Sequence, residues 1–134
     1  MQWLVKEEPE HYSFAQFAAD GSTVWSGVRN PVAQKNLRSM KTGDRVFFYH
    51  TGKQRAVVGT AVVAGTPSPD PKDKTGKLFL VELAAGEALK RPVTLAEIKA
   101  DPRFASFALV RISRLSVMPV SDAEWKAIVA MSQR

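Results

Sequence analysis

The alternation of apolar and polar residues predicts strands at several places along the chain. A short first strand is expected at Trp3–Lys6, and Pro9 then excludes further ladder pairing. The segment 45–50 is rich in β-branched and aromatic residues, which favour strands. Its alternation places Val46, Phe48 and His50 on one side and Arg45, Phe47 and Tyr49 on the other. Further strands are predicted at 55–64, at 78–83 with an extension toward 89, and at 115–118.

Helix-start signals lie between these strands. In a capping box, a Ser or Thr side chain accepts from the backbone N–H three residues on, where a Glu or Gln reaches back. Three such pairs occur: Ser13 with Gln16, Thr94 with Glu97, and Ser121 with Glu124. Asn30 followed by Pro31 is a fourth start, because Asn is a strong N-cap and Pro suits the first helical position. Helices are therefore expected from Ser13 to Asp20, from Pro31 to about Ser39, from Thr94 to about Asp101, and from Ser121 onward.

This order of elements favours the α+β class. The central strands follow one another in hairpin-like order, and the helices interrupt them without the regular alternation of a doubly wound parallel sheet. Gly59 lies inside the predicted strand 55–64 and indicates a bulge or the close approach of another group. We expect a single domain over residues 1–134, because no internal repeat or linker divides the chain.

Composition narrows the cellular setting. The chain has no cysteine, which excludes disulfides, thiolate metal ligands and a cysteine nucleophile. No apolar run reaches the roughly 18 residues of a membrane-spanning helix, and the first residues lack a signal-peptide pattern. The prediction is a cytoplasmic protein without a membrane partner. Nothing in the sequence fixes the oligomeric state, for which we take a monomer as the default.

Positive charge is concentrated in one part of the chain. The formal net charge is +6, and residues 29–55 alone carry seven basic residues against one acidic residue. Residues 1–28 are net acidic, with four acidic residues against Lys6. Such a concentration favours a polyanionic partner such as nucleic acid, the alternative being a basic but solvated surface.

Catalytic constellations are missing from the sequence. His11 and His50 have no metal-ligand spacing with each other or with carboxylates. The chain has neither a Gly-rich phosphate loop nor a nucleophile elbow. Glu7 and Glu8 are adjacent and would point to opposite faces of a strand, which does not suit an acid–base pair. We therefore expect no enzyme activity, no cofactor and no metal.

Binding chemistry is concentrated in the stretch Thr23–Pro31. Trp25 offers a surface for stacking a base, and Ser26 and Asn30 offer groups that read base edges. Trp25 is expected in a loop between helices, and the alternative is that it belongs to the core. Candidate phosphate-binding side chains follow in the basic segment: Arg29, Lys35, Arg38 and Lys53.

Five motifs, in order along the chain, resemble the EVE domain family. They are Trp3-Leu4-Val5-Lys6-x-Glu8-Pro9, Trp25-x-Gly27-Val28-Arg29-Asn30-x-x-Ala33, Gly43-Asp44-x-Val46-x-Phe48-Tyr49-His50, Lys90-Arg91-Pro92-Val93 and Leu115-Ser116-Val117-x-Pro119-Val120. The resemblance implies a PUA-like fold, a small mixed β-barrel of about five to six strands flanked by short helices. Thr51 after Tyr49-His50 departs from the serine expected there.

The resemblance also implies a function and a site. It implies a non-catalytic reader that accepts a flipped, modified base, with modified cytosine in DNA favoured. The pocket would draw on Trp25, Ser26, Gly27, Val28, Arg29 and Asn30, with Lys6, Glu8, Tyr49, His50 and Ser116 at its rim or floor. Two alternatives stay open: a PUA-like RNA-binding module, and a nucleotide- or small-anion-binding protein or enzyme that uses the same pocket.

Overall fold

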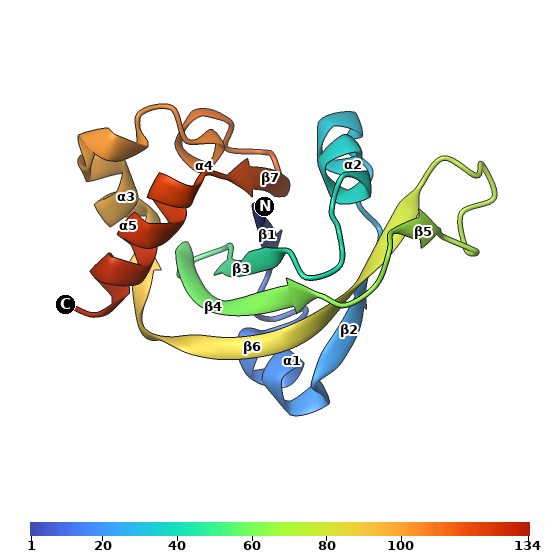
Figure 1. Ribbon diagram of the computed structural model, residues 1–134, viewed down its shortest axis with the longest axis horizontal. Coiled ribbons are helices and arrows are strands. Elements are labelled where there is room, and N and C mark those ends of the chain that lie inside the picture. Colours follow the sequence, from blue (N-terminus) through green and yellow to red (C-terminus); the bar gives the residue numbers. More distant parts are fainter.

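A mixed seven-stranded sheet forms the centre of the computed structural model, which describes residues 1–134 (Figure 1). The strands are β1 (Gln2–Glu7), β2 (Ser22–Trp25), β3 (Arg45–His50), β4 (Ala56–Val63), β5 (Ser68–Pro69), β6 (Phe79–Thr94) and β7 (Val117–Val120). The helices are α1 (Phe14–Asp20), α2 (Pro31–Arg38), α3 (Leu95–Ala100), the 3-10 turn η1 (Pro102–Phe104), α4 (Ala108–Arg111) and α5 (Asp122–Ser132). The α+β class is therefore confirmed.

The sheet is strongly curved and is not closed into a complete ring. Its strand order is β2-β6-β4-β3-β1-β7, with β5 paired to β6. β1 and β3 are parallel, and all other pairs are antiparallel. β6 is 16 residues long: it pairs with β4 from Leu83 to Thr94, and its first residues also pair with β5 and β2. Figure 1 shows α2 and β5 at one end of the molecule and α3 and α5 at the other.

The side chains of β3 alternate between two faces, as expected, and each face packs against a separate apolar cluster. On one face, the Phe48 ring contacts the rings of Phe14, Phe17, Trp25 and His50. On the other face, Phe47 stacks on Trp125 of α5, with ring centroids 3.7 Å apart. The Arg45 guanidinium lies over the same Trp125 ring, 4.6 Å from its centroid. One strand therefore joins two apolar clusters, because its successive side chains point to opposite faces.

All four predicted helix starts are confirmed. Thr94 and Ser121 form complete capping boxes with Glu97 and Glu124. Ser13 caps α1 by accepting from the Gln16 backbone N–H, and the Gln16 side chain instead donates to Asp20. Asn30 caps α2. These signals depend on hydrogen bonds within one turn of the chain, which is why the sequence is enough to predict them.

Several elements differ from the expectation. The strand β2 and the short elements β5, η1 and α4 were not predicted, and the last strand begins two residues later than expected, at Val117. Ser22–Trp25 forms a strand because it pairs with β6, from Ser22 opposite Ala84 to Trp25 opposite Val81. Non-local pairing of this kind leaves little trace in four residues of sequence.

The Arg91–Glu97 ion pair gives a pH-dependent contribution to stability. Hydrogen bonds from Arg91, and then from the Thr94 backbone N–H, lower the pKa of the Glu97 carboxyl from 4.5 to about 2. A carboxyl whose pKa is lower in the folded state stabilises the fold above the unfolded pKa, and this stability is lost as the pH falls from 4.5 toward about 2.

We therefore expect Glu97→Gln to destabilise the protein at pH 7 by about 1 kcal/mol, mainly because a neutral amide no longer forms the ion pair with Arg91, while its oxygen still accepts from the Thr94 backbone N–H. The difference from the unmodified protein should shrink at pH 3. Urea denaturation at both pH values measures it. Glu82→Gln is the matched control, because the Glu82 carboxylate makes no ion pair. A difference of equal size at both pH values would contradict this assignment.

Candidate functional site

Trp25 lies at the end of β2 and not in a loop between helices, which corrects the sequence-based expectation. Its side chain is only 7% exposed and belongs to the core, and its ring meets the Phe48 ring edge-on at 5.5 Å. Its indole N–H makes no hydrogen bond within the chain. Because every fully buried side-chain polar atom does have a partner, this N–H is accessible from the surface. The Phe48 ring packs against the Trp25 ring from the core side.

A cavity of about 250 Å³ opens beside Trp25, between β2 and the end of β1. Its lining residues are Glu7, His11, Tyr12, Thr23, Val24, Trp25 and Ser26. β7 pairs with β1 only from Gln2 to Val5, and the Lys6 backbone N–H donates to the Ser116 carbonyl just before β7. Glu7, the last residue of β1, is therefore the β1 residue that lines this cavity. Sequence reasoning found Trp25 and Ser26 but missed the β1 and α1 side of the cavity, because only the folded sheet brings these segments together.

The rest of the Ser26–Asn30 stretch is shaped by helix α2. The Asn30 side chain accepts hydrogen bonds from the backbone N–H groups of Val32 and Ala33, so it acts as a helix cap. Gly27 has a φ of 74°, which favours glycine. The Val28 carbonyl accepts a hydrogen bond from Gln34, a buried side chain that also bonds both backbone groups of Phe79. Gln34, which was not predicted, therefore fixes this stretch to β6.

The other predicted pocket residues lie outside the Trp25 cavity. Lys6 Nζ donates to the Ser113 carbonyl at 2.9 Å and lies over the Tyr49 ring, 5.6 Å from its centroid. Burial lowers the pKa of Lys6 and raises the pKa of the almost fully buried Tyr49. The Ser116 carbonyl accepts from the Lys6 backbone N–H. Lys6, Tyr49 and Ser116 therefore form a cluster of their own, in which Tyr49 comes from β3 on one side of β1 and Ser116 directly precedes β7 on the other.

His50 has a structural role that its sequence position did not suggest. Its Nε2 accepts from the Phe14 backbone N–H at 3.0 Å, and its Nδ1 lies 2.7 Å from Gln54 Oε1. This network assigns the hydrogen to Nδ1, since an amide oxygen needs a donor. Both ring nitrogens are thus used within the fold. Glu8, another predicted rim residue, is exposed beside Gly52.

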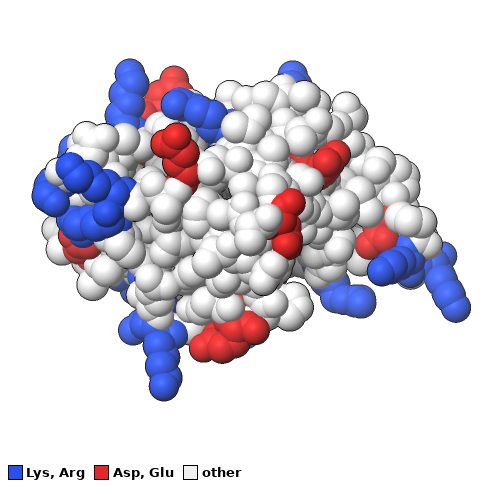
Figure 2. Space-filling view, turned by 90° about the horizontal axis from the view of Figure 1, so that it is seen from below, with Lys and Arg blue, Asp and Glu red and all other residues white.

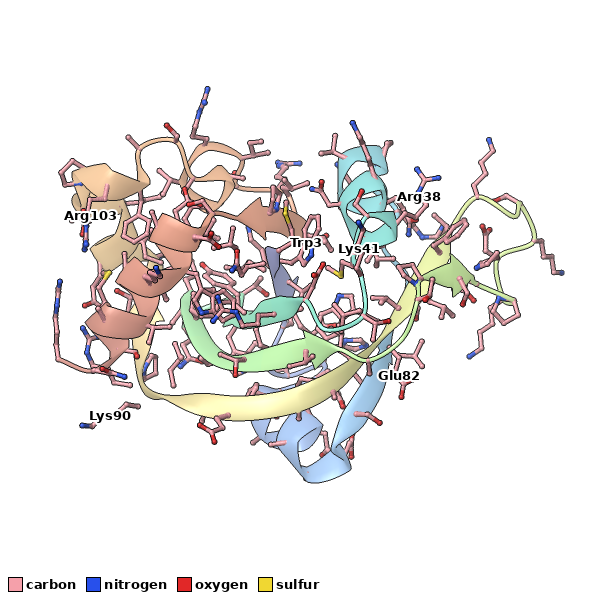
Figure 3. All side chains as sticks on the ribbon, in the orientation of Figure 1. Trp3, Arg38, Lys41, Glu82, Lys90 and Arg103 are labelled. Atoms are coloured by element: carbon pink, nitrogen blue, oxygen red, sulfur yellow. The ribbon has the colours of Figure 1, made fainter.

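A second cavity, of about 510 Å³, lies between α2 and the segment before β6. Its lining residues are Arg29, Pro31, Gln34, Arg38, Gly76, Lys77, Leu78 and Phe79. The Arg38 guanidinium lies over the Phe79 ring at 5.6 Å, and Figure 3 shows Arg38 extending from α2 toward the end of the molecule that carries β5. We call this cavity the α2 groove. It combines three cations with an aromatic wall and has no acidic lining residue.

Not every predicted phosphate-binding residue lines the α2 groove. Arg29 and Arg38 do, whereas Lys35 is exposed on α2 outside it and Lys53 lies in a separate hollow near α3. Lys77 and Phe79 were not predicted. They reach the groove because Asp73 folds the preceding loop, accepting from the backbone N–H groups of Leu78, Thr75 and Lys77. These bonds, with the Thr75 side chain, also hold the pKa of Asp73 below its usual value.

The EVE domain family matches residues 1–131 of the chain. The protein belongs to the EVE domain family. Among its curated relatives, human thymocyte nuclear protein 1 is 27% identical over 166 aligned residues, which cover 98% of this chain and 74% of the human protein. The expectation drawn from the five sequence motifs is therefore confirmed.

Solved structures of similar proteins have the same fold. The protein Rpa0253 from Rhodopseudomonas palustris superposes with a TM-score of 0.93 at 44% identity, over 98% of this chain and 92% of that chain. Human THYN1 in complex with DNA containing 5-methylcytosine superposes with a TM-score of 0.90 at 26% identity, over 99% of this chain and 98% of that chain. An ASCH protein from Zymomonas mobilis, 14% identical with a TM-score of 0.63, shares the fold alone.

Two further features of the structure concern membrane-spanning helices and metal-binding groups. No helix in the structure is long and apolar enough to cross a bilayer. No group of three or more His, Asp or Glu side chains is arranged to hold a metal ion.

Proposed function

We propose that this protein binds nucleic acid and reads a modified base, 5-methylcytosine in DNA being favoured, in the cavity beside Trp25. The main observation in support of the proposal is that a short segment, Trp25–Arg29, joins this cavity to the α2 groove. Trp25 is fixed at the wall of one, and Arg29, four residues later, lines the other. A related EVE protein has been solved with 5-methylcytosine-containing DNA, which supports a base of this class.

The Trp25 cavity supplies groups suited to a base removed from its stack. The indole gives an apolar wall, and its free N–H donates to a base-edge acceptor. Glu7 and Ser26 add acceptor and hydroxyl groups at the rim. Removing a base from the stack costs a few kcal/mol of free energy. Packing of the base against one aromatic side chain offsets roughly 1–3 kcal/mol of this cost.

The α2 groove supplies the charge that the Trp25 cavity lacks. The cavity's lining includes Glu7, whose carboxylate lies 3.2 Å from His11 Nδ1, and no Lys or Arg. Phosphates would instead contact Arg29, Arg38 and Lys77. Base selection and backbone binding are thus assigned to separate surfaces, and the two should be affected by different substitutions.

A fluorescence anisotropy titration tests the proposal. Labelled oligonucleotides that differ only in cytosine or 5-methylcytosine are titrated with the protein, and a ribonucleotide version serves as a further arm. We expect tighter binding to the methylated DNA. Trp25→Phe, which keeps a ring but removes the N–H, should reduce that preference, and Trp25→Leu should abolish it.

Trp125→Phe is the matched control, because Trp125 stacks on Phe47 on the other face of β3. It should leave the preference for methylated DNA unchanged. Equal binding of cytosine and 5-methylcytosine by the unmodified protein would overturn the proposal. A preference for the ribonucleotide version that disappears with 2′-deoxy substitution would instead support the RNA-binding alternative.

A further inference from the structure

We propose that a hollow near α3 is a second contact for the sugar-phosphate backbone of the same nucleic acid. This inference rests on the proposed function. The hollow has a volume of about 340 Å³, and its lining residues are Lys53, Gln54, Arg55, Thr94, Leu95, Ala96 and Lys99. We call it the α3 hollow. Neither the Trp25 cavity nor the α2 groove shares a residue with it.

The α3 hollow is positively charged and has no internal counter-charge. Lys53 and Arg55 come from the β3–β4 connection, and Lys99 comes from α3. None of the three forms an ion pair, and no carboxylate lines the hollow. The nearest carboxylate along α3, Glu97, is neutralised by two hydrogen bonds from Arg91. Three unpaired cations around one depression favour an anion with several charges.

The backbone that carries these cations is fixed rather than free. Arg55 has a φ of 44°, which is uncommon for a residue with a side chain, and its carbonyl accepts from the Leu95 backbone N–H at 2.8 Å. Gln54 is tied to His50, which in turn accepts from the Phe14 backbone N–H. The connection is therefore anchored to both α3 and the core, so that less ordering is needed when an anion binds.

The α3 hollow is connected to the proposed base site through β1. The Thr51 backbone N–H donates to the Glu7 carbonyl at 2.9 Å, and Glu7 lines the Trp25 cavity. Lys53 follows Thr51 by two residues, a reach of at most about 7 Å. Ser26, which also lines the Trp25 cavity, precedes Arg29 of the α2 groove by three residues. Two cationic surfaces are thus linked to the lining of the base site: the α3 hollow through Glu7, and the α2 groove through Ser26.

The overall distribution of charge agrees with two separate contacts. The α2 groove and the α3 hollow lie toward opposite ends of the molecule's long axis, where α2 and α3 are found in Figure 1. Figure 2 shows Lys and Arg side chains gathered toward both ends, with a mainly uncharged middle that carries scattered acidic residues. This pattern fits a strand that crosses the molecule and is held at two points, with a base inserted between them.

The test is a salt titration of DNA binding. A triple variant, Lys53→Gln, Arg55→Gln and Lys99→Gln, is compared with a control triple variant of the same charge, Lys41→Gln, Arg111→Gln and Lys126→Gln. The control residues are exposed and line neither cationic surface. Both are titrated with a 20-mer containing a central 5-methylcytosine and with its unmethylated version, at several salt concentrations, after thermal unfolding confirms that each variant folds.

We expect the α3-hollow variant to bind at least tenfold more weakly, and to do so equally for both oligonucleotides. The slope of log K against log salt should fall by about 3 relative to the unmodified protein, because each substituted cation no longer neutralises about one phosphate. The control variant should change the slope by less than about 1. If the α3-hollow variant and the control variant behave alike, the second contact does not exist.

The outcome separates this inference from the proposed function. A reduced slope with an unchanged methylcytosine preference supports the second contact, whereas an unchanged slope overturns it even when the preference is present. If the unmodified protein shows no preference but the slope still falls in the α3-hollow variant, the backbone contact stands and the base-reading proposal fails.

Discussion

Phe48→Ala is expected to lower the free energy of unfolding by about 3–5 kcal/mol, which is the usual cost of deleting a fully buried phenyl ring. Phe48 is 0% exposed, and its ring lies 5.5–5.6 Å from four other aromatic rings. The rings that surround it come from three other places in the fold: α1, β2 and the end of β3. Alanine would leave a cavity that those rings cannot fill without moving away from their other neighbours.

Chemical denaturation measures this effect, with two comparison variants. Phe48→Leu fills much of the space and should cost less than about 2 kcal/mol. Phe79→Ala removes a half-buried ring at the α2 groove and should also cost less than the core variant. Because Phe48 backs the Trp25 indole, Phe48→Leu should also weaken the preference for a methylated base. A destabilisation below about 1 kcal/mol for Phe48→Ala would contradict the assigned core.

Gly59→Ala is expected to cost about 2–3 kcal/mol, because it adds a methyl group to a space that is already full. A Cβ at Gly59 would lie 2.3–2.7 Å from three atoms of the Phe14 ring. That ring has little freedom to move, since it meets Phe17 and Phe48 edge-on and its backbone N–H is bound by His50. The sheet register shifts on both sides of Gly59 in its pairing with β6.

Two variants make the cause of this destabilisation measurable. Gly65→Ala is the matched control, because a Cβ there meets nothing closer than 3.8 Å, and it should leave stability within about 0.5 kcal/mol. The double variant Gly59→Ala with Phe14→Leu should be less destabilised than the sum of the two single variants, since removing the ring relieves the overlap. Strict additivity in thermal or urea unfolding would show that the cost of Gly59→Ala comes from elsewhere.

In the proposed function, the three surfaces have separate roles. The Trp25 cavity is lined by carboxylate, hydroxyl and aromatic groups, whereas the cations lie in the α2 groove and the α3 hollow. Selectivity and affinity should therefore respond to separate substitutions. The edge strands of the curved sheet, β2 and β7, do not pair with each other, and the Trp25 cavity lies where β2 approaches the end of β1.

Part of the candidate site could be predicted from the sequence. The Trp25–Asn30 stretch stands out because a helix cap, a proline and an aromatic residue occur within a few positions, and the cap is confirmed. Gly59 was also predicted correctly as a point of close approach, although its partner Phe14 was not. The sequence groups Lys35 and Lys53 with Arg38 by charge alone, and the structure places them apart.

The amino-acid sequence by itself determined the helix starts, the alternation in β3, the α+β class and the family, because these depend on neighbouring residues or on ordered motifs. Only the tertiary structure decided that Trp25 ends a strand, that His50 bonds the start of α1, and that Glu7 faces β2. It also placed Lys99 beside Arg55. Contacts of this kind join residues far apart in the chain, and they form only when the sheet curves and brings those residues together.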